Sequence, residues 1–269
     1  MAKKAAKINI LIIGSGNIAW HLVSHLSFFR RFNITVFNRT KNKRLSQLIK
    51  EFKVNGISDW KKINNDSQLI FICTGDNSIK SIASKIGKLK TKALVVHTSG
   101  TTPLSELKPA SDNNGVFYPL QTFTFGKSVN WQEVPVFYEG NSKSSEKFLE
   151  AFGKLFSKSV IKLNSQDRLK LHLSAVIAGN FSNAMFAAAY DYLSLELNKE
   201  YFKYLAPLIS ATAKKAIFNI PAKVQTGPAA RNDKKTINKH LSLLKKHPEL
   251  KKLYRSTSKL ISKQQKNHA

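Results

Sequence analysis

Cysteine is almost absent from this sequence. The chain has 269 residues and a single cysteine, Cys73, so it can form no internal disulfide and offers no cysteine cluster to a metal. No stretch approaches the ~18 apolar residues of a membrane helix. The basic start, Met1–Lys7, precedes an apolar run of only Ile8–Ile13, which is too short for a signal peptide. We therefore expect a cytoplasmic protein with no metal and no membrane attachment.

Acidic residues are also few. The chain has 16 Asp and Glu against 44 Lys and Arg, which gives a formal net charge of +28. Basic surfaces attract nucleic-acid phosphates. Most of these cations are lysines spread along the whole chain, whereas base and phosphate recognition favours the planar fork of arginine. We interpret the charge as a solvated surface and expect no specific nucleic-acid partner.

Short apolar runs alternate with helical patterns over the first 160 or so residues. The expected strands are Ile8–Ile13, Ile34–Phe37, Leu69–Cys73, Ala93–Val96, Val116–Tyr118, Val134–Tyr138 and Val160–Leu163. Continuous apolar strands separated by helices are typical of a parallel sheet covered on both faces. The sequence therefore predicts a doubly wound α/β domain over residues 1–163.

The pattern changes near residue 164. From Ser165 to about Leu197 there is no proline, and Gly179 is the only glycine. A long helix with apolar residues on several faces should be buried, often between subunits. The rest of the chain reads as helices with one break around Ile220–Ala230. We expect an all-α domain over residues 164–269.

A glycine motif follows the first expected strand. The segment Gly14-Ser15-Gly16-Asn17-Ile18-Ala19 matches the dinucleotide pattern G-x-G-x-x-G/A. Gly14 allows a tight turn, Gly16 lets the backbone approach a diphosphate, and Ala19 lets the helix pack closely on the strand. The free N–H groups at the start of that helix favour an anion. The motif predicts a nicotinamide dinucleotide site.

The end of the second strand favours NADP over NAD. An acidic residue there would accept a hydrogen bond from the ribose 2′-hydroxyl of NAD, but this chain has Asn38, Arg39 and Thr40. Arg39 can clamp a 2′-phosphate or stack on adenine, and its neighbours can donate hydrogen bonds. We expect NADPH as the cofactor.

Two further loops follow expected strands and should lie near the nicotinamide, because ligands bind beyond the carboxyl ends of parallel strands. Thr74 and Asp76 follow the strand Leu69–Cys73. His97, Thr98 and Ser99 follow Ala93–Val96. Ordinary turn formation and helix capping by these small polar residues is the alternative interpretation.

The sequence resembles a known family, the bacterial proteins in which a Rossmann-like NADP-binding domain precedes a domain of unknown function, DUF2520. The resemblance covers nearly the whole chain. The segments that carry it are GSGNIA at Gly14–Ala19, VHTSG at Val96–Gly100, GVFYPLQTF at Gly115–Phe123, LHLSAVIAGNFSN at Leu171–Asn183 and TGPAARND at Thr226–Asp233.

That family is similar to a wider group with helical C-terminal domains like that of 6-phosphogluconate dehydrogenase, including ketopantoate reductases and pyrroline-carboxylate reductases. Members are described as NADP oxidoreductases. The resemblance implies a Rossmann domain, a helical domain that forms a homodimer, and an active cleft between the two. It does not fix the substrate.

A carbonyl reductase needs a proton donor for the developing alkoxide. Matching Leu171–Asn183 to the ketopantoate reductase pattern puts His172 where that family has a lysine, and Asn180 at the second of two asparagines. The first asparagine is replaced by Val176. A histidine can act as the acid because its pKa lies near neutrality.

A second register remains open. It makes Lys170 the donor, with Ser174 one turn later, as in 6-phosphogluconate dehydrogenases. The two registers exclude each other, since Lys170 and His172 lie about 160° apart on a helix. We favour His172, because Gly179, Asn180 and Asn183 lie on or near its face. A hydrogen-bonded core histidine with two asparagines bridging helices is the structural alternative.

Other polar residues could orient the substrate. Gln121 and Thr122 follow a strand, in a loop stiffened by Pro119. Ser99 and Asn183 are further candidates for contact with the substrate. Arg231 lies in the expected helix break and could bind a substrate carboxylate, or could instead pair with Asp233 or across a dimer interface.

These features lead to three hypotheses. The first is an NADP-dependent oxidoreductase acting on a small carbonyl substrate, such as the 2-oxo acid 2-dehydropantoate (ketopantoate). The second is an imine reductase of the pyrroline-carboxylate reductase type. The third is a sensor or interaction protein that binds NADP without turnover.

Overall fold

The computed structural model describes residues 7–268. Its contacts divide the chain into two compact units, with the boundary between Gly179 and Asn180. The sequence pattern places a domain boundary earlier, after residue 163 and before helix α5 (Ser165–Ala175). By its contacts α5 belongs to the first unit, because Arg168 and His172 on this helix bind side chains of the sheet domain.

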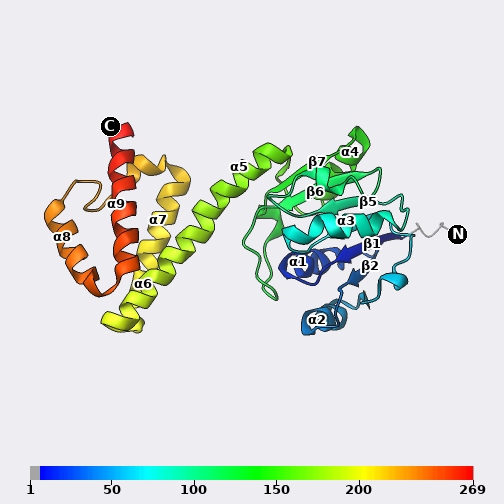
Figure 1. Cartoon of the computed structure of the whole chain (residues 1–269), viewed down its shortest axis with the longest axis horizontal. Coiled ribbons are helices and arrows are strands. Elements are labelled where there is room, and N and C mark those ends of the chain that lie inside the picture. The colour runs from blue at the N-terminus through cyan, green and yellow to red at the C-terminus, as the bar shows by residue number, and fades with distance from the viewer. Residues whose placement is uncertain (1–6, 269) are drawn as a thin grey trace. The chain divides into compact units, whose positions relative to one another are not determined.

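The first unit is built on an eight-stranded sheet (Figure 1). The strand order is β3-β2-β1-β4-β5-β6-β7-β8, and every neighbouring pair is parallel except β6 with β7. The strands are β1 (Ile8–Ile13), β2 (Phe32–Phe37), β3 (Asn55–Ile57), β4 (Leu69–Ile72), β5 (Leu94–His97), β6 (Asn114–Pro119), β7 (Val136–Gly140) and β8 (Val160–Lys162). The expected doubly wound α/β fold is confirmed.

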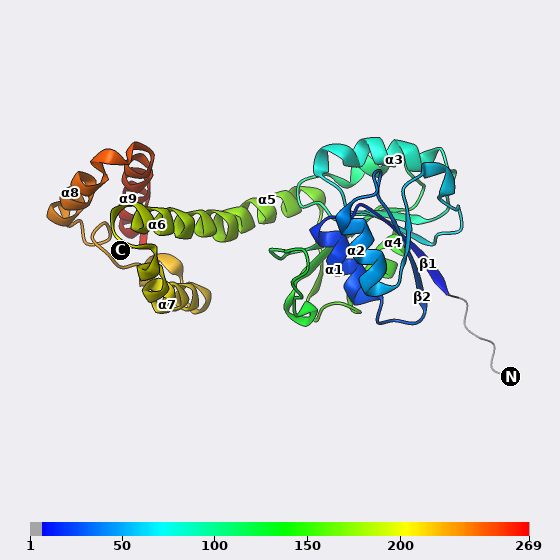
Figure 2. The same ribbon diagram turned by 90° about the horizontal axis from the view of Figure 1, so that it is seen from below.

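Both faces of the sheet are buried. Along β1, Ile10 and Ile12 enter one apolar cluster and Leu11 and Ile13 enter another, because successive side chains of a strand point to opposite faces. The first cluster is covered by α1 (Asn17–Leu26), α2 (Lys43–Phe52) and α4 (Lys143–Gly153). The second is covered by α3 (Ile79–Gly87), which lies on the opposite side of the sheet (Figure 2). This double burial explains why the strands are apolar at consecutive positions.

The structure differs from the sequence prediction at two strands. β3 was not expected, because Asn55-Gly56-Ile57 is a short segment with little apolar character at the edge of the sheet. β7 runs antiparallel to β6 instead of parallel. The connection between them, residues 120–135, contains only the short 3-10 helix η4 (Trp131–Glu133) and no crossover helix, which a parallel pair requires.

The second unit is helical (Figure 1). Its helices are α6 (Ser182–Glu196), α7 (Ala206–Phe218), α8 (Lys234–Leu243) and α9 (Pro248–His268). A π-helical turn, η5 (Val176–Phe181), leads from α5 into α6 without interruption, so the long helix expected from Ser165 is present with this one irregularity. The expected break holds the 3-10 turn η7 (Pro221–Val224) and an irregular loop.

The second unit buries very little of its apolar surface. Among its described residues only Ala229 and Leu244 are buried hydrophobics, and α6 and α7 bury none. In contrast, Leu195 and Phe218 are 72% and 81% exposed. Within residues 7–268, no helix has both the length and the apolar character needed to cross a membrane.

Candidate functional site

The glycine turn after β1 leaves the start of helix α1 open. Gly14 has φ +115°, and a side chain there would also collide with the Cys73 carbonyl oxygen. Both constraints require glycine. At Gly16 a Cβ atom would have no neighbour within 4 Å, and the first turn of α1 carries no acidic residue. The backbone N–H groups of this turn can therefore receive an anionic group.

The side chains beside these glycines hold the surrounding loops. The Ser15 hydroxyl lies 3.3 Å from the Asn42 side chain, which caps α2. The Asn17 side chain donates to the Phe123 carbonyl oxygen at 2.9 Å. Ile18 packs on the core cluster. Ser15, Asn17 and Ile18 would therefore contact an anion through their backbone N–H groups, since their side chains bind or pack elsewhere.

A cavity of about 280 Å³ opens at the carboxyl ends of β1, β2 and β4. The lining residues are Ile13, Gly14, Phe37, Asn38, Arg39, Trp60, Thr74, Ser78, Ser81, Ile82 and Lys85. The lining contains two cations and no carboxylate. Lys85 Nζ lies 5.6 Å from the centre of the Trp60 ring, and that ring packs against Phe37. The cavity therefore combines an aromatic wall with positive charge.

Asn38 shapes the turn that carries Arg39. Its side chain donates to the Thr40 carbonyl oxygen at 2.8 Å, and its backbone N–H donates to the Ile57 carbonyl oxygen. Arg39 and Thr40 are exposed. Arg39 is thus an exposed residue of the cavity lining.

The loops after β4 and β5 are tied to each other. Thr101 donates to the Asp76 carboxylate at 2.5 Å, and Ser78 donates to the Thr74 hydroxyl at 2.8 Å. The Ser99 hydroxyl accepts from the backbone N–H groups of Thr101 and Thr102, so it forms a turn of the kind that the alternative interpretation expects. Asp76 remains exposed, with its carboxylate at this edge of the sheet.

Thr98 and His97 contact buried groups. The Thr98 side chain hydrogen-bonds to Cys73, whose thiol pKa burial raises to about 12. His97 is fully buried, and its Nδ1 accepts from the Ser99 N–H at 3.2 Å. Burial first, and then the Arg168 cation, lower the pKa of His97 to about 3. His97 is therefore a neutral imidazole, with Nε2 near the Pro103 carbonyl but outside hydrogen-bond geometry.

His172 projects from α5 onto the end of β6. Its Nδ1 lies 2.9 Å from the hydroxyl oxygen of Tyr118, a residue of β6 that is 8% exposed. Gly100 lies against both rings: a Cβ atom there would come within 2.8 Å of the His172 Cγ atom and 3.0 Å of the Tyr118 Cζ atom. The pair therefore depends on the absence of a side chain at residue 100.

Arg168 fixes α5 one turn before His172. This guanidinium is 1% exposed and donates to the Glu139 carboxylate of β7 at 2.6 Å and to the Thr102 carbonyl oxygen at 2.6 Å. Ser165 donates to the same carboxylate and accepts from the Leu104 N–H. These bonds attach α5 to the sheet and to the loop after β5, and so set the position of His172.

The second register of α5 has different surroundings. Lys170 is exposed and forms an ion pair with Asp167 at 2.9 Å. Ser174 is exposed and donates to the Lys170 carbonyl oxygen of the same helix. Neither side chain bonds to the ends of the strands, whereas His172 does.

The remaining candidates are exposed. The Gln121 side chain accepts from the Thr122 N–H, and the Thr122 methyl lies 3.9 Å from where a Cβ on Gly179 would be. Three candidates belong to the second unit, namely Asn180, Asn183 and Arg231.

Asp233, the alternative partner of Arg231, caps helix α8. Hydrogen bonds from the backbone and hydroxyl of Thr236 are the main cause that lowers the pKa of the Asp233 carboxyl, and the Arg231 charge adds a smaller effect.

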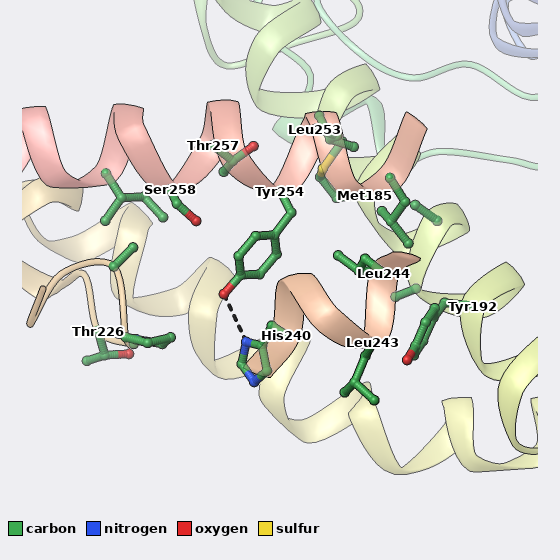
Figure 3. Close-up of a pocket in the computed structure, with 17 residues that line it drawn as sticks. Met185, Tyr192, Thr226, His240, Leu243, Leu244, Leu253, Tyr254, Thr257 and Ser258 are labelled. Carbon is green, nitrogen blue, oxygen red and sulfur yellow. Dashed lines mark hydrogen bonds between the residues drawn. The ribbon is translucent and has the colours of Figure 1, made fainter. Parts of the chain in front are cut away.

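The second unit contains an apolar hollow of about 610 Å³ (Figure 3). Its walls come from α6, α8, α9 and the loop after η7, and include Met185, Tyr192, Leu243 and Leu253. One polar pair lies in the wall, where the His240 ring and the Tyr254 hydroxyl are 2.8 Å apart.

Across residues 7–268, no group of three His, Cys, Asp or Glu side chains could hold a metal ion.

Three residues of these sites were missed by sequence reasoning. The sequence pattern predicts Tyr118 only as the end of a strand, because its partner His172 is 54 residues away. Trp60 and Lys85 join the cavity from elements that carry no motif. Only tertiary packing brings them together.

The doubly wound sheet, the open helix start behind Gly14 and the cationic cavity beside β2 define a Rossmann-type dinucleotide-binding protein. Family models agree with this class. Residues 134–261 match the domain of unknown function DUF2520, and residues 1–96 match the shikimate/quinate 5-dehydrogenase model.

A crystal structure from Bacteroides fragilis, described as a candidate NADP oxidoreductase, is 32% identical to this chain. It covers 96% of this chain and 98% of its own, with a TM-score of 0.88. This chain belongs to the family in which a DUF2520 domain follows a Rossmann-like NAD(P)-binding domain, as the sequence motifs predict.

More distant structures share the fold. A Thermotoga maritima protein is 19% identical with a TM-score of 0.69, covering 96% of this chain and 99% of its own. Pyrroline carboxylate reductase of Plasmodium falciparum, solved with NADP bound, is 10% identical with a TM-score of 0.60, covering 95% and 98%. A search of curated proteins finds no match.

Proposed function

We propose that this protein is an NADP-dependent oxidoreductase that reduces a small carbonyl substrate, with a 2-oxo acid such as 2-dehydropantoate as the first candidate. The observation that carries the proposal is the His172–Tyr118 pair at the carboxyl end of β6, beside the loop after β5. That edge of a parallel sheet is where bound dinucleotides and their substrates lie. The Bacteroides fragilis relative described as a candidate NADP oxidoreductase supports the same class.

The residues around the glycine turn fit a dinucleotide. The open N-terminus of α1 suits a diphosphate, and Trp60 offers an aromatic wall to an adenine ring. Arg39 and Lys85, with no carboxylate beside them, suit a 2′-phosphate and favour NADPH over NADH. When bound, the reduced dinucleotide supplies the hydride.

His172 serves as the proton donor to the reduced carbonyl oxygen. Its ring faces the strand ends, whereas Lys170 lies in an ion pair with Asp167 and Ser174 bonds to its own helix. Gln121 and Thr122, which belong to the same unit as His172, remain candidates for orienting the substrate.

Turnover of NADPH with a panel of 2-oxo acids tests the proposal. We expect His172→Gln to lower kcat about 100-fold or more and to leave the NADPH affinity unchanged, since a positioned acid contributes about 10²–10⁴-fold. Lys170→Gln distinguishes the registers: full activity supports His172, and a comparable loss supports Lys170. A wild-type protein that binds NADPH but reduces no substrate would favour the sensor hypothesis.

An imine reductase is the second candidate, and one observation favours it. Asp76 is an exposed carboxylate near Tyr118. Burial is the main cause that raises the pKa of the Tyr118 phenol; the Arg168 cation lowers this pKa, and the Asp76 charge adds to the increase. A carboxylate at the reacting edge attracts a cationic iminium and repels a 2-oxo acid. Comparing kcat/KM for a cyclic imine and a 2-oxo acid decides between the two, and Asp76→Asn should lower only the imine value.

We also propose that the second unit forms a homodimer. Helix α6 is apolar on several sides and buries no residue, and Met185 and Phe186 are 39% and 38% exposed. A helix of this kind needs a permanent partner. We take this partner to be a second copy of this chain, and the apolar walls of the hollow in Figure 3 add to the surface it could cover.

Sedimentation analysis at micromolar concentration tests the dimer. We expect a dimeric wild-type protein, and a Phe186→Glu variant that is monomeric or aggregated. Lys263→Glu, an exposed change on α9, is the matched control and should stay dimeric. A monomeric wild type would show the proposal to be wrong.

A further inference from the structure

The neighbours of His172 fix more than its position. We infer that Tyr118 is a positioning residue that holds neutral His172 as the tautomer with hydrogen on Nε2 and gives Nδ1 a proton while Nε2 gives its own to the substrate. This inference rests on the proposed function, in which His172 protonates the reduced substrate. The geometry that supports it is the 2.9 Å contact between the Tyr118 hydroxyl and His172 Nδ1.

The direction of this hydrogen bond follows from the surroundings of Tyr118. Burial is the main cause that raises the pKa of the Tyr118 phenol, so the group keeps its hydrogen at neutral pH. No other hydrogen bond joins this hydroxyl to a residue that the structure describes. A buried O–H needs an acceptor, and Nδ1 of a neutral imidazole is one. The ring hydrogen must then lie on Nε2.

Charged groups around the pair are few. On α5, Arg168 is paired with Glu139 of β7. Asp76 follows β4 and is bonded to Thr101. His97 of β5 is held neutral by burial and by the Arg168 cation. Tyr118 is therefore the one neighbour that the structure places in hydrogen-bond contact with the His172 ring.

The proton balance is simple. After hydride reaches the substrate carbon, the carbonyl oxygen becomes an alkoxide and takes the proton from Nε2. Nδ1 takes the proton of the Tyr118 hydroxyl as Nε2 gives its own away, which leaves a phenolate beside an Nδ1–H ring. Water then protonates Nε2, and Nδ1 returns its proton to the phenolate, which restores the starting tautomer. His172 stays neutral throughout, so reduction needs no imidazolium. The rate should therefore stay level across the pH range in which histidines lose their charge, about 5 to 8.

Gly100 makes room for this arrangement. Its φ lies outside the left-handed region, so alanine fits the backbone, but the added methyl would overlap the His172 ring at Nδ1. Gly100→Ala should therefore break the hydrogen bond without removing either partner. It provides a second variant, independent of Tyr118→Phe.

The test uses ¹⁵N-histidine-labelled full-length protein, since the two ring nitrogens of an imidazole resonate apart when only one carries hydrogen. His172→Gln identifies the signals of His172. We expect hydrogen on Nε2 in the wild type, and a shift toward the other tautomer in Tyr118→Phe and Gly100→Ala. Tyr138→Phe is the matched control, since this 7% exposed tyrosine of the next strand bonds to Glu150 and to no histidine.

Turnover gives the second readout. With a substrate of the wild type in hand, we expect Tyr118→Phe to lower kcat and to make it fall as the pH rises, because an imidazolium must then supply the proton. Identical His172 spectra in wild type and both variants would overturn the inference even if the enzyme is active. A wild type that reduces nothing but shows the expected spectra would overturn only the proposed function.

Discussion

Replacing Arg39 by alanine tests how the protein selects its cofactor. Arg39 and Lys85 both line the cavity beside β2, and the lining contains no carboxylate. A hydrogen bond to a charged group contributes about 1.5–3 kcal/mol. Because Arg39 is exposed, solvent screening favours the lower end of this range. We expect Arg39→Ala to weaken NADPH binding about tenfold.

The assay is a calorimetric titration of both cofactors. NADH lacks the 2′-phosphate, so its affinity for Arg39→Ala should stay within about twofold of the wild-type value. Arg31→Ala is the control: it removes the same charge at the start of β2, where Arg31 lies over the Phe32 ring. It should change the affinity for neither NADPH nor NADH. Equal weakening of NADPH and NADH, or no weakening of either, would refute the assignment of Arg39.

Two further predictions concern the stability of the first unit, which contains all three tryptophans and can be followed by their fluorescence. Arg168→Met leaves the Glu139 carboxylate without its buried partner, and urea titration should show a free energy of unfolding lower by about 3 kcal/mol. An unchanged urea midpoint would show that this ion pair does not hold α5. His97 has a folded-state pKa of about 3, below the value near 6.5 of an unfolded histidine, so only the unfolded chain gains a proton between these values. The contribution of neutral His97 to the free energy of unfolding should therefore be fully present above pH 6.5 and be lost progressively toward pH 3. His97→Gln should reduce this loss of stability at low pH.

The sheet could be predicted because burial on both faces leaves a direct mark on sequence. Strands such as β1 and β4 are apolar at consecutive positions, and the glycine turn after β1 has a fixed spacing. The edge strand β3 has no such mark, because it is short and includes Asn55 and Gly56. β7 runs antiparallel because no crossover helix connects it to β6. The apolar runs of the sequence do not show the direction of a strand.

The site was harder to predict, because its contacts join distant parts of the chain. The resemblance to ketopantoate reductases made His172 a candidate, but its hydrogen bond to Tyr118 and the close approach of Gly100 arise only when α5 packs on the sheet. His97 was expected near the cofactor, yet it is fully buried at the end of β5. Sequence pattern gives the element on which a residue lies, whereas packing decides what its side chain meets.

Deuteride transfer tests the central claim most directly. The purified protein would be incubated with NADPH deuterated at the transferable position and with a panel of 2-oxo acids and cyclic imines, and the products analysed by mass spectrometry. The account predicts one deuterium on the former carbonyl or imine carbon of at least one substrate, with matching formation of NADP⁺. NADPH that stays reduced and products that stay unlabelled across the whole panel would contradict it.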